Sequence, residues 1–258
     1  MTLLSVQHLG KSFGGVAAAR DVSFTLQRGE MLAIIGPNGA GKSTVFNMVG
    51  GQLRPDRGTV LLDGRNITAA SPQMRFRLGV GRTFQVAQTF LSMSVAENVQ
   101  MALVSRRRES GALWSPARSR CRDEAVTLLE RVGMADAADH PCSALAYGDV
   151  KRVELAIALA GHPKLLLMDE PTAGMAARER ADLMDLTASI ADAEGIGVLF
   201  TEHDMDVVFG HAERVIVLVR GQTIATGSPE DIRQDPDVRR AYLGDEHALE
   251  KPKGMDSA

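Results

Sequence analysis

The sequence has few cysteines, few aromatic residues and no long hydrophobic run. Only two cysteines, Cys121 and Cys142, occur among 258 residues. They have no C-x-x-C spacing, so they predict neither a disulfide framework nor a zinc site, and a reducing, cytoplasmic setting suits the chain. No stretch approaches the roughly 18 to 20 apolar residues that cross a bilayer. The N-terminal stretch MTLLSVQHLGKSFGG also lacks the features of a signal peptide, so we do not expect a channel or carrier.

The chain also lacks an excess of charge of either sign. The formal net charge is −3, from 29 Lys and Arg and 32 Asp and Glu. This balance gives no electrostatic reason to expect nucleic acid as a partner. Hydrophobic residues make up 45% and charged residues 24%, which is ordinary for a globular protein. The length suits one large domain, or a core with a subdomain.

One stretch, residues 31–44, matches a phosphate-binding motif. It reads MLAIIGPNGAGKST, in which an apolar run predicts a buried strand, the glycines a turn, and Lys42 the start of a helix. Glycines let backbone N–H groups close around phosphate oxygens, and the helix N-terminus favours an anion. Lys42 is expected to supply a charge for the β- and γ-phosphates, and the Ser43 hydroxyl to bind magnesium.

The alternative is a glycine-rich turn that precedes a helix by accident, and this pattern arises by chance in a chain of this length on the order of once per hundred proteins. The strand–turn–helix setting makes chance a poorer explanation. The sequence therefore predicts nucleoside triphosphate binding. The expected phosphate-binding residues are Gly36, Pro37, Asn38, Gly39, Ala40, Gly41, Lys42, Ser43 and Thr44.

Two further predicted strands end in candidate catalytic side chains. The apolar run 165–168 is followed by Asp169 and Glu170, and strand 197–201 is followed closely by His203. Open α/β sheets bind their ligands at the carboxyl ends of the strands. In a phosphate-loop protein we therefore expect Asp169 to hold magnesium and Glu170 to orient the attacking water, rather than a plain surface acidic pair. His203 is placed to reach the γ-phosphate.

Three other features are weak signals on their own. Phe13 precedes two glycines and is a candidate platform for a base, although a core phenylalanine at a turn is the commoner case. Gln85 follows predicted strand 79–84, where glutamine can contact magnesium or the attacking water, or serve as an ordinary loop residue. Residues 106–122 carry six arginines against one glutamate. Contact with anionic headgroups is one explanation, and a solvated loop is the commoner one.

The hydrophobic patterns place these motifs on alternating strands and helices. The character changes to helical from about residue 92. Strands are expected at 3–9, 21–27, 59–63, 79–84, 165–168, 197–201, 214–219 and 222–226, and helices at 94–104, 123–132, from 150, and at 176–194.

In their order along the chain, these motifs resemble those of the ATP-binding-cassette (ABC) ATPases. The phosphate loop 36–44, Gln85, the signature stretch 145–149, the segment 165–170 and His203 all follow the family's order. The resemblance covers nearly the whole chain. It implies an α/β fold, with a P-loop NTPase (RecA-like) core, an N-terminal antiparallel β subdomain and an inserted α-helical subdomain. It also implies a single domain over 1–246, with the helical part at about 90–160 and a C-terminal tail at 247–258.

The resemblance assigns roles that the isolated patterns leave open. Phe13 falls where the family stacks the adenine ring, which reverses the preference for a core residue. Gln85 is expected to line the γ-phosphate and to bind magnesium. Two subunits are expected to sandwich two ATP molecules, so that Ala146 and Gly148 of one chain act on the nucleotide of the other.

Within the family, several phrases are most similar to the LivG-type ATP-binding subunits of branched-chain amino acid importers: GRTFQVAQTF, DEPTAGM, TEHDMDVVFGHAERVIVL and the ending AYLG. This resemblance implies an ATPase that uses ATP and Mg²⁺ at the cytoplasmic face of the membrane. Its implied partners are integral permease subunits, a second ATPase chain (related or identical) and, indirectly, a periplasmic binding protein.

Two other functions stay open. The ATPases of lipopolysaccharide export share the GRTFQ opening and a YLG ending, which makes a lipid exporter the alternative. The second of these functions is a nucleotide-dependent regulatory module that hydrolyses ATP poorly.

Two departures from the family pattern bear on hydrolysis. The signature usually reads Leu-Ser-Gly-Gly-Gln, but here it is LAYGD, with Ala146 in place of serine. Ala176 stands where the family has an aspartate, which affects communication between the two sites. We expect a weaker but working ATPase.

Overall fold

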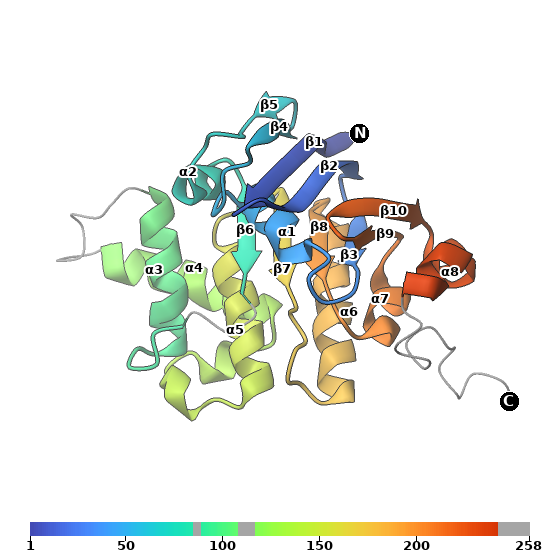
Figure 1. The fold of residues 1–258 in the computed structure, drawn as a ribbon. Coiled ribbons are helices and arrows are strands. Elements are labelled where there is room, and N and C mark those ends of the chain that lie inside the picture. Colours follow the sequence, from blue (N-terminus) through green and yellow to red (C-terminus); the bar gives the residue numbers. More distant parts are fainter. Residues whose placement is uncertain (85–88, 108–116, 242–258) are drawn as a thin grey trace, which may run out of the picture.

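The structure, a computed structural model, describes residues 1–84, 89–107 and 117–241. Gln85, the centre of the arginine-rich stretch and the predicted tail at 247–258 lie outside the described residues. Two sheets and the helices between and around them make up the fold (Figure 1).

The larger sheet has the strand order β10-β9-β3-β8-β7-β6. All neighbouring strands in it are parallel, except that β10 runs antiparallel to β9. Its central strands are apolar except at the carboxyl ends of β7 and β8, because both faces of the sheet are covered, and they lie where the sequence predicts them. The strands are β3 (Met31–Ile35), β6 (Val80–Thr83), β7 (Leu165–Asp169), β8 (Gly197–Thr201), β9 (Arg214–Val219) and β10 (Gln222–Gly227).

The smaller sheet is antiparallel, with the order β2-β1-β4-β5, and confirms the predicted N-terminal β subdomain. Its first hairpin is longer than expected, because pairing continues to Phe13 and Val16 around Gly14 and Gly15. Both glycines have positive φ angles, which a two-residue hairpin turn requires. The strands are β1 (Thr2–Phe13), β2 (Val16–Gln27), β4 (Arg57–Leu62) and β5 (Arg65–Asn66).

Helix α1 (Lys42–Gly50) belongs to the hydrophobic core between the two sheets. Apolar side chains from α1, from one face of β3 and from the antiparallel strands form a single buried cluster. Its members include Val45, Phe46, Met48 and Val49 of α1, Leu32 and Ile34 of β3, and Leu4, Val6 and Leu26 of the smaller sheet.

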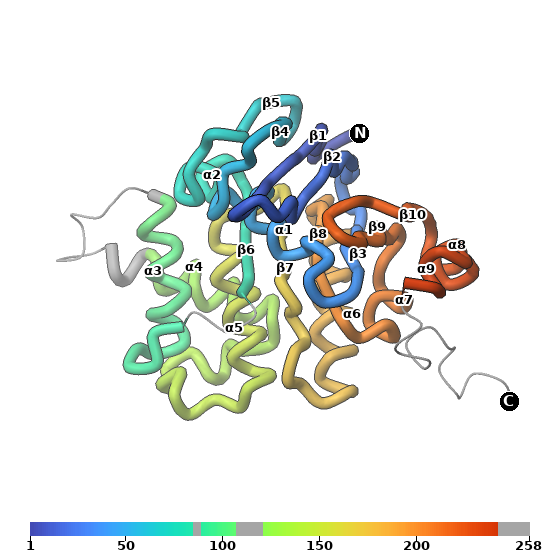
Figure 2. The backbone as a smooth tube through the Cα atoms, in the orientation of Figure 1, coloured from blue at the N-terminus to red at the C-terminus, as the bar shows by residue number. Residues whose placement is uncertain are grey.

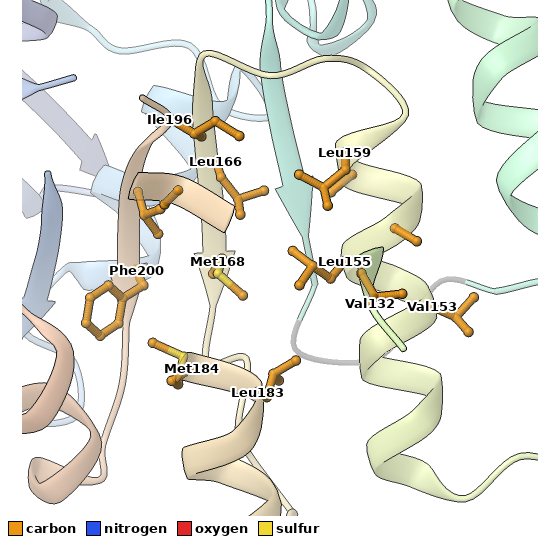
Figure 3. Close-up of a cluster of buried hydrophobic side chains, with 14 of the residues drawn as sticks. Val132, Val153, Leu155, Leu159, Leu166, Met168, Leu183, Met184, Ile196 and Phe200 are labelled. Atoms are coloured by element: carbon orange, nitrogen blue, oxygen red, sulfur yellow. The ribbon is translucent and has the colours of Figure 1, made fainter. Parts of the chain in front are cut away.

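The opposite face of the larger sheet packs against helices. Side chains from β7, β8, α5 and α6 meet in one cluster, drawn in Figure 3. Its labelled members include Leu166 and Met168 of β7, Phe200 of β8, Leu155 and Leu159 of α5, and Leu183 and Met184 of α6. Alternate residues of β7 thus face the two cores, which is the period-two alternation of a strand.

Helices α3, α4 and α5 gather on one side of the molecule, and α8 and α9 lie on the other (Figure 2). Helix α4 begins at Ala117, so the end of the arginine-rich stretch is helical and the loop prediction is wrong there. Arginine is a good helix former, and Cys121 of this segment is buried in the core. The first group comprises α3 (Val95–Arg107), α4 (Ala117–Arg131) and α5 (Tyr147–Leu159), with short 3₁₀ helices at Ala135–Ala137 and Cys142–Ala144.

Within the described residues, the other helices are α6 (Ala177–Glu194) and the shorter α2 (Pro72–Arg77), α7 (Met205–His211), α8 (Pro229–Gln234) and α9 (Pro236–Ala241). Helix α2 has no clear hydrophobic period and is not predicted by the sequence. Along the described parts of the chain, no helix is long and apolar enough to cross a membrane.

Candidate active site

The motifs predicted from the sequence follow three adjacent strands, β3, β8 and β7. The phosphate loop follows β3, Asp169 ends β7 and leads into Glu170, and His203 lies two residues beyond β8. Parallel strands present their carboxyl ends at one edge of a sheet. The structure therefore brings Lys42, Asp169, Glu170 and His203 to the same edge.

The phosphate loop can form only because glycine occupies two crowded positions. A Cβ atom on Gly36 would lie 2.1 Å from the backbone oxygen of Leu218, and one on Gly41 would lie 2.2 Å from that of Ala18. Gly41 also has a φ of 102°, which side-chain-bearing residues rarely adopt. Within the loop, Asn38 and Gly39 are exposed, whereas Ala40 is buried.

Neighbouring segments hold this loop in place. The backbone N–H of Gly221, in the turn between β9 and β10, donates to the Ala40 oxygen at 2.8 Å. The Gly221 oxygen in turn accepts from the N–H of Arg20 on β2 at 2.7 Å. Sequence reasoning did not find these anchors because backbone contacts between distant segments leave no local pattern.

Lys42 lies folded across the loop. Its Nζ atom donates to the Gly36 oxygen at 2.6 Å and to the Pro37 oxygen at 3.3 Å, and the residue is only 7% exposed. Burial lowers the pKa of Lys42, while the nearby carboxylates of Glu170 and Asp169 act in the opposite direction. The lysine thus lies within electrostatic reach of Asp169, which ends β7, and of Glu170, which follows it. Ser43 at the start of α1 is exposed.

Two protein donors orient the Asp169 carboxylate. Its Oδ1 atom accepts from the Thr201 hydroxyl at 2.9 Å, and its Oδ2 atom lies 3.4 Å from a guanidinium nitrogen of Arg82. Arg82 also donates to the side-chain oxygen of Asn47 on α1 at 2.8 Å, and its guanidinium lies 5.0 Å from the ring centre of Phe46. Burial lowers the pKa of Arg82, and Asp169 opposes this effect.

Arg82 and Thr201 are site residues that sequence reasoning missed. An arginine within a short strand is usually solvent-facing, and a threonine at a strand end is common. Only the position of Arg82 inside the GRTFQ phrase could have drawn attention to it.

Glu170 and His203 are in direct contact. The Glu170 Oε1 atom lies 2.9 Å from His203 Nε2, and the imidazole is half-exposed. Glu170 has a positive φ of 47°, and its backbone N–H donates to the Thr201 oxygen at 3.1 Å. This left-handed turn directs the chain away from β7 just where the predicted catalytic carboxylate begins.

The signature stretch lies at the N-terminus of α5. Ala146 precedes the helix and is exposed, and no side chain caps the first turn because alanine has no acceptor. A Cβ atom on Gly148 would lie 3.3 Å from the Glu179 carboxyl carbon, so glycine permits a close approach of α6. Residue 146 therefore supplies no side-chain acceptor to the first N–H groups of α5.

Phe13 lies at the end of β1, and its side chain is 51% exposed. The alternative of a core phenylalanine is therefore wrong. The ring contacts the Lys11 ammonium, which lies 5.7 Å from the ring centre.

Comparison with known families decides what kind of protein carries this site. Residues 19–173 match the family model described as ABC transporter. The chain belongs to the ABC transporter family. Residues 222–248 of this cassette also match the model described as Branched-chain amino acid ATP-binding cassette transporter.

Curated relatives match this cassette over nearly its whole length. The high-affinity branched-chain amino acid transport ATP-binding protein LivG of Salmonella typhimurium is 41% identical over 250 residues, which is 94% of this chain and 98% of that protein. The lipopolysaccharide export system ATP-binding protein LptB of Acidithiobacillus ferridurans is 38% identical over 249 residues, covering 96% and 99%.

A solved structure described as the ADP conformation of an ATP-binding cassette of an ABC transporter superposes on this one with a TM-score of 0.85. It is 32% identical, and the match covers 95% of this chain and 99% of that one. These findings confirm the predicted family and fold class. The roles of individual side chains remain predictions.

Proposed function

We propose that this cassette is the ATP-binding and ATP-hydrolysing subunit of a membrane importer of branched-chain amino acids. The observation that carries the hydrolytic part is the contact between Glu170 and His203 at the sheet edge that also holds the phosphate loop. The importer and its cargo rest on the match of residues 222–248 and on the likeness to LivG.

Nucleotide binding would use groups that are already in place. Backbone N–H groups of residues 36–44 would surround the phosphates at the start of α1. Lys42 would exchange its two backbone carbonyl partners for phosphate oxygens, which are stronger acceptors because they are charged. The exposed ring of Phe13 would stack on the adenine.

The residues present fit a magnesium ion bound through the nucleotide. Mg²⁺ usually takes one or two protein oxygens together with substrate phosphates. Along the described chain, no group of three or more His, Cys, Asp or Glu side chains could hold a metal without the nucleotide. Asp169, oriented by Thr201, and the exposed Ser43 hydroxyl would supply the protein oxygens, with Gln85 as a further candidate. When bound, the ion neutralises charge on the β- and γ-phosphates.

The protein's part in hydrolysis would be positioning and charge stabilisation. Glu170 would accept a hydrogen bond from the attacking water and hold it in line with the γ-phosphate. His203, which contacts Glu170, would donate to the γ-phosphate, and Gln85 would line the same space. Lys42 would stabilise the charge that develops on the transferred group.

A complete site would need a second cassette. The first turn of α5 has no side-chain cap, Ala146 before it is exposed and Gly148 within it is buried; its N–H groups would be offered to the nucleotide held by the partner chain. The partner would be a related ATPase subunit or a second copy. Both would sit on permease subunits at the cytoplasmic face of the membrane, with a periplasmic binding protein delivering the cargo.

The lipid exporter remains the second candidate, because LptB is 38% identical over nearly the same length. The importer is preferred because residues 222–248 match the family model of branched-chain amino acid ATP-binding cassette transporters. Intact Glu170 and His203 argue against a poorly hydrolysing regulatory module.

The test of hydrolysis is ATP turnover by the purified chain and by Glu170→Gln. Glutamine keeps the shape, but its neutral amide oxygen is a weaker acceptor for the attacking water than the carboxylate and cannot take up its proton, so turnover should fall by about 10²- to 10⁴-fold while ATP binding persists. Glu230→Gln on α8, at an exposed position, is the matched control and should behave as wild type. Equal turnover of wild type and Glu170→Gln would refute the enzymatic proposal.

The partners are tested by purifying the tagged chain from its own membranes. Two permeases and a second ATPase would support the heteromeric importer. Permeases without a second ATPase would favour a homodimer and bring the exporter forward. The absence of any membrane protein would refute the transport proposal.

A further inference from the structure

Glu202 is a buried carboxylate to which the proposed mechanism assigns no role. It lies between Thr201, the last residue of β8, and His203, and is only 4% exposed. Isolated buried charges are costly, so such a group is normally satisfied by hydrogen bonds. The donors that satisfy it indicate what Glu202 does.

Both carboxylate oxygens of Glu202 are occupied by defined donors. The Oε1 atom accepts from the backbone N–H of Thr172 at 2.9 Å and from the Thr172 hydroxyl at 2.7 Å. The Oε2 atom accepts from the backbone N–H of His203 at 3.2 Å. One side chain therefore joins the segment after β7 to the segment after β8.

These bonds continue the pairing of β7 and β8 beyond the end of the sheet. The regular register ends at Asp169 and Thr201, and one more backbone bond joins Glu170 to Thr201. The Glu202 side chain takes the place of the next backbone rung, at Thr172.

The two segments that Glu202 joins each carry one residue of the proposed catalytic pair, Glu170 or His203. Thr172 lies in the turn after Glu170, where the Ala173 N–H donates to the Glu170 oxygen at 3.2 Å and the Met175 N–H donates to the Thr172 oxygen at 3.1 Å. His203, held from the other side, carries the imidazole that contacts Glu170. The Glu170–His203 contact is thus flanked by two backbone segments that share one anchor.

We propose that Glu202 is a positioning residue for ATP hydrolysis: it ties the turn after β7 to the backbone of His203 and thereby sets the contact between His203 and Glu170. This inference rests on the proposed function of those two residues. Burial also raises the pKa of Glu202, an effect that its hydrogen bonds from Thr172 and His203 oppose, so an uncharged residue would fill this space at lower cost.

The variant Glu202→Gln separates the two halves of this anchor. Thr172 offers two donors and His203 only one, so the amide is expected to turn its oxygen toward Thr172 and keep both of those hydrogen bonds. The amide NH₂ then faces the His203 N–H, so a donor meets a donor and only that bond is lost. The side-chain shape is unchanged.

Three measurements compare the variant with wild type: kcat and KM for ATP, affinity for a fluorescent ATP analogue, and the imidazole NMR signal of His203. That signal is assigned by its loss in the variant His203→Ala. We expect kcat to fall by roughly tenfold or more, because one hydrogen bond is lost and the imidazole moves. KM and analogue affinity should stay within about twofold of wild type, since the phosphate loop is untouched. The His203 signal should shift.

Glu30→Gln is the matched control. Glu30 is also a buried carboxylate, and it accepts from the Gln27 N–H at 2.6 Å and from Arg214 at 2.7 Å. It directly precedes β3, so it lies at the opposite end of this strand from the phosphate loop. Its replacement should cost stability yet leave kcat and the His203 signal unchanged. A general loss of stability would therefore affect both variants alike.

The outcomes separate this inference from the proposed function. A His203 signal that does not respond to Glu202→Gln, or a kcat equal to wild type, overturns the inference and leaves the hydrolytic function standing. Absence of ATP turnover in wild type overturns the proposed function, whereas the His203 signal still reports whether Glu202 positions the imidazole. A tenfold loss of kcat with unchanged KM and a shifted signal supports the proposal.

Discussion

Ala146 is the residue at which this cassette departs most clearly from its family's pattern. Serine at this position would place a hydroxyl at the uncapped N-terminus of α5, where it could bond the partner's γ-phosphate. One such bond contributes about 0.5–1.5 kcal/mol. The helix N-terminus and its free N–H groups remain in either case, so the cassette should work without the hydroxyl, only more slowly.

Ala146→Ser should therefore raise ATP turnover, by about tenfold at most. Steady-state ATPase assays of the assembled dimer measure the effect. Ala144→Ser, two residues earlier and also exposed, is the control and should leave turnover unchanged. If Ala146→Ser turns over at the wild-type rate, the hydroxyl has no part in this site.

At the residue scale, the sequence predicts side chains whose chemistry is tied to a fixed spacing. The glycines and Lys42 of the phosphate loop, and the acidic pair after β7, are of this kind. The sequence does not predict roles for Arg82, Thr201 and Glu202, because each of them acts through a residue that is distant in the sequence. The contacts that orient a site depend on tertiary packing, and a single sequence does not reveal them.

At the scale of elements, the phosphate-loop helix depends on a helix that the sequence did not predict. The last carbonyls of a helix lack partners within it. Arg75 of α2, 1% exposed, donates to the oxygens of Met48 and Val49 in the last turn of α1. It also donates to the Ala70 and Thr68 oxygens at 3.1 and 3.0 Å.

Arg75→Met should consequently destabilise the protein by about 3 kcal/mol or more, because buried carbonyls lose their donors. The free energy of unfolding in urea is the measurement. Arg77→Met lies on the exposed face of the same helix and should change it by less than about 0.5 kcal/mol. Equal effects of the two variants would show that Arg75 does not support α1.

The short buried strands are predicted well, and the errors have physical causes. The central strands β3, β7 and β8 are mostly apolar runs of five residues, and the sequence places them nearly to the residue. The first hairpin was predicted too short, because Lys11 and Ser12 are polar although their backbone pairs with β2. Helix α4 was predicted too short, because arginines in its first turns hide the apolar period.

At the scale of the whole molecule, one carboxylate joins the two sheets. Asp63, in the turn between β4 and β5, accepts from the ammonium of Lys164 at 2.7 Å and from the guanidinium of Arg28. Lys164 precedes β7 of the larger sheet, and Arg28 lies between β2 and β3. The pKa of Asp63 is lowered, and the hydrogen bond from Lys164 is the largest cause. Burial opposes this effect, while the charges of Arg28 and Lys164 and the hydrogen bond from Arg28 add to it.

A carboxylate with a lowered pKa in the folded state stabilises the protein above its unfolded pKa of about 3.9. That contribution is lost as the pH falls through the folded pKa. Asp63→Asn should therefore lower the melting temperature at pH 7, and the gap to wild type should close as the pH falls below about 4. Asp182→Asn, at an exposed site on α6, is the control. A gap that persists at low pH would show that the charge of Asp63 does not stabilise the fold.

In the proposed function, this cassette powers uptake of branched-chain amino acids by hydrolysing ATP with the help of Glu170. Uptake of labelled leucine tests this directly, in cells of the source organism whose own copy of the chain is replaced by Glu170→Gln. We expect the leucine uptake that depends on the wild-type chain to disappear, and isoleucine and valine to compete for that same uptake in wild-type cells. Unchanged leucine uptake in cells that carry only the variant would refute the proposed function.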